Sequence, residues 1–269
     1  MDVQRALPRS ELRSVVRAFQ ERRADLGGAT LAFPVAARPH QILDIHLGES
    51  YRVAINGGAA SVTPEAFIVG PQTYRRAYVH MSGVLHVFNI LFQPTGLNRL
   101  AGVNMMSLVN QDTAASDVIG KAAASLRDAV RRAPNFATRV AAAERCLGMM
   151  LEGRGPESEI GLASRGMITL RGDVRIKDLA AGSGLSASQF QRRFADEVGM
   201  TPKLFARTIR FDRALTARRE TPGRSWTDII HDFGYFDQAH FIRECHAFAG
   251  LPPTSLIGDW DNAFSPAND

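Results

Sequence analysis

The stretch GLSASQFQRRFADEVGMTPKLF, at 184–205, is repeated in outline about fifty residues later as GYFDQAHFIRECHAFAGLPPTSL, at 234–256. Each copy opens on a glycine and has a phenylalanine six or seven residues later, with an arginine two positions beyond it. A second glycine then precedes a proline by three residues in both copies. The chain therefore encodes the same local structure twice.

The first copy has the signals of a turn followed by a helix. Gly184 supplies a turn conformation that few other residues tolerate, and Ser186 is a good N-cap for a helix that begins at Ala187. Gly199 ends this helix. One helical face carries the apolar residues Phe190, Phe194 and Val198. An apolar stretch before the turn, with Ile176, Leu179 and Ala180, predicts a preceding helix that braces the next one, as in a helix–turn–helix unit.

The second copy repeats these signals. Gly234 makes the turn, Asp237 is the N-cap candidate and Gly250 ends the helix. Its apolar face consists of Phe241, Cys245 and Phe248, and the preceding helix contributes Ile229 and Ile230.

The segment PKLFARTIRFDRALTARRET between the copies has the apolar spacing of one continuous helix. A helix of about nineteen residues is ~28 Å long, and successive major grooves on one face of DNA are ~34 Å apart. One polypeptide could thus enter two adjacent major grooves. The alternative is a plain helical bundle punctuated by Gly and Pro, which the tandem arrangement disfavours.

Residues 162–257 closely resemble the DNA-binding domain of AraC/XylS-type transcriptional regulators, through RIKDLAAGSGLSASQFQRRFADEVGMTPKLF and DIIHDFGYFDQAHFIRECHAFAGLPP. The resemblance implies duplex DNA as partner, and base contacts in the major groove. The implied base-reading residues are Ser188, Gln191 and Arg192 in the first unit and Gln238, Ala239, His240, Ile242 and Arg243 in the second. Candidate phosphate contacts are Ser186, Lys203 and Arg207.

Two positions depart from the family pattern. Ile230 stands where the family usually has a small residue, and Cys245 where it usually has an aromatic one. A larger side chain at one site and a smaller one at the other can compensate in volume. The pose of the second reading helix is the feature that these departures affect.

The first half of the chain has a different character. Leu43, Ile45 and Leu47 alternate with polar residues, which indicates a half-buried strand, and Gly57-Gly58 marks a turn between two strands. Several short strands at close spacing predict a small antiparallel barrel. Residues 30–150 also resemble, more loosely, the cupin-like N-terminal domain of some AraC-type regulators. That likeness implies sensing of a small-molecule effector, which the residues do not identify, or dimerisation.

Helices are expected around this barrel. Residues 10–25 have the spacing of a basic amphipathic helix, and 118–132 and 136–151 are two further helical stretches. In the last stretch Val140, Ala143, Leu147 and Leu151 share a face that packs internally or onto a second copy. The predicted fold is thus α+β: a sensory or dimerisation domain at 1–151, a linker at 152–161, an all-α double helix–turn–helix domain at 162–258, and a flexible tail at 259–269.

Two other classes of protein stay open. A cupin metalloenzyme needs convergent histidines, typically an HxH, but His40, His46, His80 and His86 are scattered, and a turn expected at 82–83 separates the last two. Neither a GxSxG motif nor a P-loop is present. We therefore expect neither an enzyme nor a cofactor or metal. The second alternative is a protein-interaction module with weak DNA binding.

Charge and composition bound the partners. The net charge is +5, and residues 167–258 carry 13 Lys/Arg against 10 Asp/Glu, a difference of three that is modest for a domain that binds phosphates. Two cysteines without a CxxC fit a reducing compartment, and no apolar run of ~18 residues predicts a membrane span. The expected location is cytoplasmic. RNA polymerase, an effector and a second copy are further candidate partners.

Overall fold

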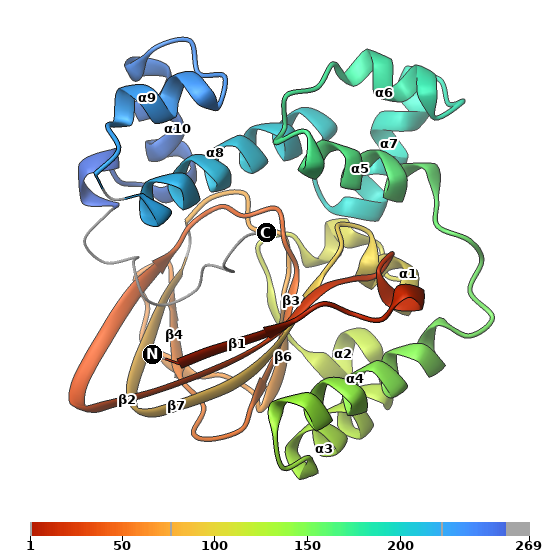
Figure 1. Ribbon diagram of the computed structural model, residues 1–269, viewed down its shortest axis with the longest axis vertical. Helices are drawn as coiled ribbons and strands as arrows, with labels where there is room; N and C mark the ends of the chain where they lie inside the picture. The colour runs from red at the N-terminus through yellow and green to blue at the C-terminus, as the bar shows by residue number, and fades with distance from the viewer. Residues whose placement is uncertain (1, 76, 222, 257–269) are drawn as a thin grey trace.

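The computed structural model describes residues 2–75, 77–221 and 223–256. The N-terminal part of the chain forms an antiparallel sheet with one layer of helices, and the C-terminal part consists of helices alone (Figure 1). This confirms the α+β class. The predicted tail at 259–269 and the end of the DNA-binding domain at 258 lie outside the described residues.

The sheet has the strand order β1-β2-β7-β3-β6-β8, and β4 pairs with β5 and β7. Every pairing is antiparallel. Pairing between β1 and β8 is not found in the described residues, so closure into a barrel stays a prediction. The strands are β1 Asp2–Ala6, β2 Val16–Val35, β3 Ile42–His46, β4 Arg52–Ile55, β5 Ser61–Val62, β6 Ala66–Val69, β7 Ala77–Phe92 and β8 Asp112–Ala114.

The amphipathic helix predicted at 10–25 is wrong. A short 3-10 helix, η1 (Ser10–Leu12), is followed by the long strand β2, which pairs with both β1 and β7. Of the apolar positions that suggest a helix, Val16 and Phe19 are buried on the strand and Leu12 and Val15 are buried just before it. Glu21 and Arg22 are also buried on the strand. Tertiary pairing on both edges of β2 overrides the local periodicity.

The turn predicted at 82–83 is also wrong. Strand β7 runs through both residues, and the register with β2 shifts at this level, where Val84 pairs with Asp25 and Ser82 with Thr30. Gly83 has a φ of +65°, which a glycine adopts easily. It therefore accommodates an irregularity inside β7, and the strand continues past it. His80 and His86 therefore stand on one strand.

The strand predicted around Leu43 and the turn at Gly57 are confirmed by β3, β4 and β5. All five residues of β3 are buried, however, including Asp44 and His46. Asp44 accepts hydrogen bonds from the Tyr51 hydroxyl (2.5 Å) and the Asn89 amide (2.6 Å). The polar residues of β3 are thus buried, and Asp44 has hydrogen-bond partners inside the protein.

A helical layer covers the sheet with α1 Gly96–Ala101, η2 Met105–Leu108, α2 Ala115–Ile119, α3 Ala122–Arg132 and α4 Phe136–Leu151. The single helix expected over 118–132 is broken at Gly120, which has a φ of +58°. Helix α4 has the predicted bounds. Ala143 and Leu147 of its apolar face are buried in the core that α4 shares with the sheet, so this face packs internally.

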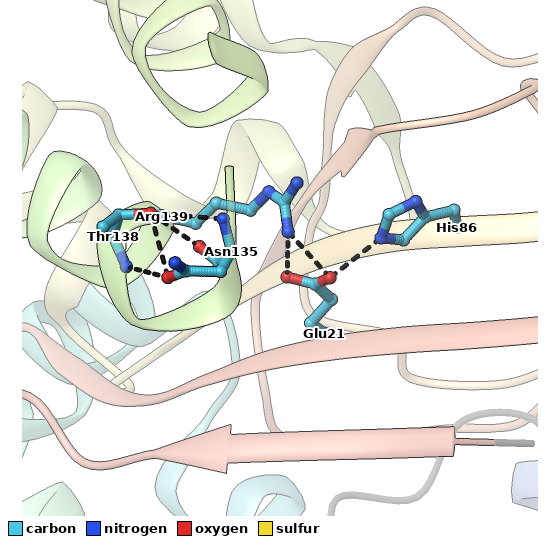
Figure 2. A network of polar contacts seen from close by, with 5 residues as sticks. All are labelled: Glu21, His86, Asn135, Thr138 and Arg139. Carbon is cyan, nitrogen blue, oxygen red and sulfur yellow. Dashed lines mark hydrogen bonds and ion pairs between the residues drawn. The ribbon is translucent and has the colours of Figure 1, made fainter. Parts of the chain in front are cut away.

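A buried ion pair joins α4 to the sheet (Figure 2). Arg139 Nη1 lies 2.9 and 3.0 Å from the two carboxylate oxygens of Glu21, and His86 Nε2 lies 2.8 Å from Glu21 Oε1. The start of α4 is closed by a capping box between Asn135 and Thr138. The ion pair thereby fixes the position of α4 on the sheet.

The C-terminal region consists of α5 Glu159–Thr169, α6 Ile176–Gly182, α7 Ala187–Val198, α8 Pro202–Glu220, α9 Trp226–Asp232, α10 Gln238–Ala249 and the 3-10 helix η3 Pro253–Ser255. Helix α5 begins inside the segment expected to be a linker. Helices α5–α7 lie at one end of α8 and α9–α10 at the other, as Figure 1 shows. Each group packs an apolar core of its own with α8.

Candidate nucleic-acid interface

The first helix–turn–helix unit has the geometry that its sequence predicts. Gly184 has a φ of +68° in the turn, and α7 runs from Ala187 to a left-handed Gly199. A capping box closes its start: the Gln189 N–H lies 3.3 Å from Ser186 Oγ, and the Ser186 N–H donates to Gln189 Oε1 at 3.0 Å. Ser186 therefore caps the helix through its hydroxyl.

The solvent face of α7 carries the predicted base readers. Ser188, Gln191 and Arg192 are all exposed, while the opposite face is fully buried. The neighbouring Arg193 differs, because its guanidinium donates to Glu197 (3.0 and 3.1 Å) and to Glu159 (3.3 Å). Arg192 is the arginine of this pair whose position suits a base edge.

The second unit repeats this arrangement with one difference. Asp237 caps α10 by accepting from the His240 N–H at 2.6 Å, and Gly250 ends the helix. Gln238, Ala239 and Arg243 are exposed, whereas His240 and Ile242 are half-buried. The His240 ring packs edge-on against Tyr235, with centroids 5.3 Å apart. The eight predicted base readers thus lie on the two exposed helix faces, with two at the margin of the second.

Phe236 is a surface residue that the sequence reasoning missed. It immediately precedes the N-cap of α10 and is 89% exposed. The signal was a difference in spacing: two residues lie between Gly234 and its N-cap, against one between Gly184 and its N-cap. Tyr235 fills the buried place in the turn, and the additional residue is exposed to solvent just before α10 begins.

Helix α8 holds the two units apart. It has nineteen residues, with Thr201 as N-cap and proline at its first position. Lys203 is exposed near its start, as a phosphate contact requires. Arg207, in contrast, donates through Nε and Nη2 to Glu244 Oε1 (3.0 and 2.6 Å) and lies over the Phe248 ring. The structure uses Arg207 to tie α8 to α10.

Ile230 and Cys245, the two departures from the family pattern, are buried in the core of the second unit. Burial raises the pKa of the Cys245 thiol to about 12, so it stays protonated and unreactive at neutral pH. These residues act in packing.

The N-terminal domain contacts both units. On the first, Asn104 Nδ2 donates to Asp196 Oδ1 at 3.1 Å, and Gly199 lies against Met105 and Pro71 so closely that a Cβ there would come within 2.9 Å of both. On the second, the Ala37 N–H donates to the Phe248 carbonyl at 2.9 Å. Both helix–turn–helix units therefore contact the N-terminal domain.

A buried polar contact joins the domains at the middle of α8. His40 Nε2 lies 2.7 Å from Arg17 Nη1 and 3.5 Å from Asp212 Oδ2. Because a guanidinium only donates, the ring nitrogen accepts and the histidine is neutral. Burial and the Arg17 charge lower the pKa of His40 to about 4, in agreement with this geometry.

A cavity of about 70 Å³ lies between the sheet and α8. Its walls combine apolar side chains of the strands, such as Val53, Phe67 and Val79, with Leu215 of α8. Arg38 and Asp44 also line it. The cavity is thus built by both domains.

The histidines of the sheet domain make separate contacts. His46 Nε2 bonds to Thr63 Oγ1 at 2.9 Å, while His40 and His86 have the partners given above. Among the described residues no three His, Cys, Asp or Glu side chains converge as metal ligands would. Nor does any described helix have the length and apolarity to span a membrane.

Comparison with known protein families finds one match in each part of the chain. Residues 179–257 match the family described as "Helix-turn-helix domain", and residues 4–114 match "Domain of unknown function (DUF6597)". The C-terminal region is therefore a helix–turn–helix DNA-binding domain. It is of the AraC type, the class of domain found in transcription regulators, as its sequence predicts.

Solved structures with a similar arrangement include ToxT from Vibrio cholerae O395, at 12% identity over 89% of this chain and 98% of that chain, with a TM-score of 0.46. Unsaturated fatty acid-bound ToxT from V. cholerae strain SCE256 is 13% identical over 92% and 98%, with a TM-score of 0.45. The AraC-like transcriptional activator CuxR is 13% identical over 80% and 86%, with a TM-score of 0.31. The comparison with curated proteins gives no match.

Proposed function

We propose that this protein is a sequence-specific transcription regulator that inserts α7 and α10 into two adjacent major grooves. The observation that carries the proposal is the pair of capped helices at the two ends of α8, each with an exposed face of small, amide and guanidinium side chains. Such side chains hydrogen-bond to base edges. The base contacts are Ser188, Gln191, Arg192, Gln238, Ala239 and Arg243, with His240 and Ile242 at the margin.

Ser186 and Lys203 are proposed to contact phosphates. Lys203 is exposed at the first turn of α8, and Ser186 stands at the positive end of α7, where main-chain N–H groups bind anions. Arg207 is assigned to Glu244 instead. These contacts position the protein, and the exposed helix faces select the sequence.

Selection of bound sequences from a random duplex library, at two salt concentrations, tests this proposal. We expect one motif with two half-sites about one helical turn apart, and weaker binding at the higher salt. A single half-site would mean that one unit has become a structural support. Enrichment of no sequence at either salt would favour the interaction module.

The N-terminal domain is proposed to sense a small molecule and to bias the arrangement of the two reading units. Its support is the cavity shared with α8, together with the contacts to both units. A ligand that fits the cavity better in one domain arrangement shifts the population towards that arrangement. In this proposal the cavity binds a ligand and has no role in catalysis. We propose no enzymatic activity.

A further inference from the structure

The cavity between the sheet and α8 has a chemistry that identifies a ligand class. Most of its wall is aliphatic or aromatic, with Ile42, Val53, Phe67, Val69 and Val79 from the strands and Leu215 from α8. Burial of a small apolar group against these side chains is favourable. A ligand that uses this wall has an apolar body.

The acidic groups of the cavity already have partners. Asp44 accepts from Tyr51 and Asn89 as described above, and Asp212 faces His40. Asp112 also has an interaction within the molecule. Because each of these carboxylates already interacts with a group of the protein, none of them requires a cationic ligand.

Arg38 is the exception among the charged groups of the wall. Its side chain is half-buried, its Nε is buried without a hydrogen-bond partner, and its guanidinium makes no hydrogen bond or ion pair to a described residue. Its backbone is fixed, because the Arg38 N–H donates to Gln72 O at 2.9 Å and the Gln72 N–H donates back at 3.3 Å. A buried donor without an acceptor is costly, and a carboxylate matches the guanidinium fork in two parallel hydrogen bonds.

The volume limits the size of the ligand. A cavity of about 70 Å³ is roughly half of the ~150 Å³ apolar cavity that accommodates benzene. An alkyl group of a few carbon atoms fills such a space, whereas a long chain does not fit without a rearrangement. From the wall, the unpartnered guanidinium and this volume, we infer that the cavity is the site of a short-chain aliphatic monocarboxylate of about two to four carbons, held by Arg38.

Binding of the carboxylate does not depend on the proposed function. The consequence that the carboxylate is the effector does rest on the proposed function. Leu215 and Asp212 of α8 line the same cavity as the strands, so an occupant contacts both domains at once. Binding would therefore alter the energy of docking between α8 and the sheet, and by linkage the affinity for DNA.

The test is calorimetric titration of the full-length protein, without DNA, with formate, acetate, propionate, butyrate and octanoate. Propylamine and 1-propanol serve as matched cation and neutral probes. We expect the lowest Kd among the two- to four-carbon acids, with both controls at least tenfold weaker. Arg38→Gln should weaken binding tenfold or more, while Arg23→Gln, an exposed arginine on β2, should not change it.

A second variant covers the case in which Arg38→Gln fails to fold. Ala77 lines the cavity and is 3% exposed, so Ala77→Ile should fill space and abolish acid binding. The inference is overturned if no acid binds, if propylamine or propanol binds as tightly as propionate, or if both variants bind like the unaltered protein. Acid binding without any DNA selectivity would instead contradict the proposed function alone.

Discussion

The main-chain N–H of Ala37 donates a 2.9 Å hydrogen bond to the carbonyl of Phe248, so the segment after β2 completes the core of the second reading unit. Ala36 and Ala37 are each 3% exposed within the same cluster as Phe211 and Phe248. The second helix–turn–helix unit is thus partly built by the sheet domain. This contact makes the position of α10 dependent on the N-terminal domain.

Replacement of Ala37 by Glu should disrupt the packing of the Ala37 segment against the second unit. The substitution buries an unpaired charge in the apolar core, at a cost of about 3 kcal/mol, and urea unfolding should show the loss. Hydrogen exchange in α9 and α10 should rise more than in α6 and α7. Ala29→Glu, an exposed change on the preceding strand β2, is the control and should leave both measurements unchanged. Equal exchange in all four helices would argue against a local role for Ala37.

Base reading predicts that Arg192→Ala and Arg243→Ala each weaken binding to the selected duplex by ~1–3 kcal/mol and relax the choice of base at one position. Arg193→Ala is a neighbouring control, because Arg193 pairs with Glu197 and Glu159. It should change the base preference at no position. Fluorescence anisotropy on duplexes with each base replaced measures these effects. Uniform weakening on all sequences would make the two arginines phosphate contacts.

Phe236→Ser should weaken DNA binding by about 1 kcal/mol while the free energy of unfolding stays within ~0.5 kcal/mol, because the ring is 89% exposed. An aromatic side chain beside a reading helix can contact a thymine methyl group. Replacement of the thymine that Phe236 contacts by deoxyuridine should weaken DNA binding of the unaltered protein but not of the Phe236→Ser variant. If the two proteins respond alike to every such replacement, Phe236 does not read thymine.

Lys203 and Arg207 should give opposite phenotypes. Lys203→Ala should lower affinity for all sequences and reduce the salt slope by about one. Arg207→Ala should instead lower stability by about 2 kcal/mol, since Glu244 is 5% exposed and loses its partner. Glu244→Gln in the Arg207→Ala background should recover part of this loss. A lower salt slope for Arg207→Ala with full stability would restore its role as a phosphate contact.

Acid should weaken the docking of α8. His40 has a pKa of about 4 in the folded protein, below its unfolded value of ~6.5. The unfolded chain therefore binds more protons between these two values, and stability falls as pH is lowered from 6.5 to 4. The groups that face His40 are Arg17, Asp212 and, at longer range, Arg38. Thermal unfolding between pH 7 and 4.5 should show a smaller drop in Tm for His40→Gln.

The duplicated segment is where sequence reasoning succeeds most fully. The starts of α7, α8 and α10 follow from Ser186, Thr201 and Asp237, and the ends of α7 and α10 follow from glycines, because caps act locally. The sheet domain is harder. The residues of β2 have helical spacing, and only their pairing with β1 and β7 makes them a strand.

Partners far apart in the sequence explain the remaining differences. Arg207 looks like a free phosphate contact until Glu244, thirty-seven positions away, is brought beside it. The cavity at Arg38 likewise exists only once α8 docks on the sheet. Such contacts leave no periodic or local signal in one sequence.

The most direct test of the central claim is the dependence of affinity on the spacing of the two half-sites. With the selected duplex as reference, one to six base pairs are inserted between the half-sites, and Kd is measured for each. Because α8 is a continuous helix of nineteen residues, we expect one sharp optimum near one helical turn, with at least tenfold weaker binding at half a turn more. A Kd that stays constant across all spacings would contradict simultaneous reading by α7 and α10.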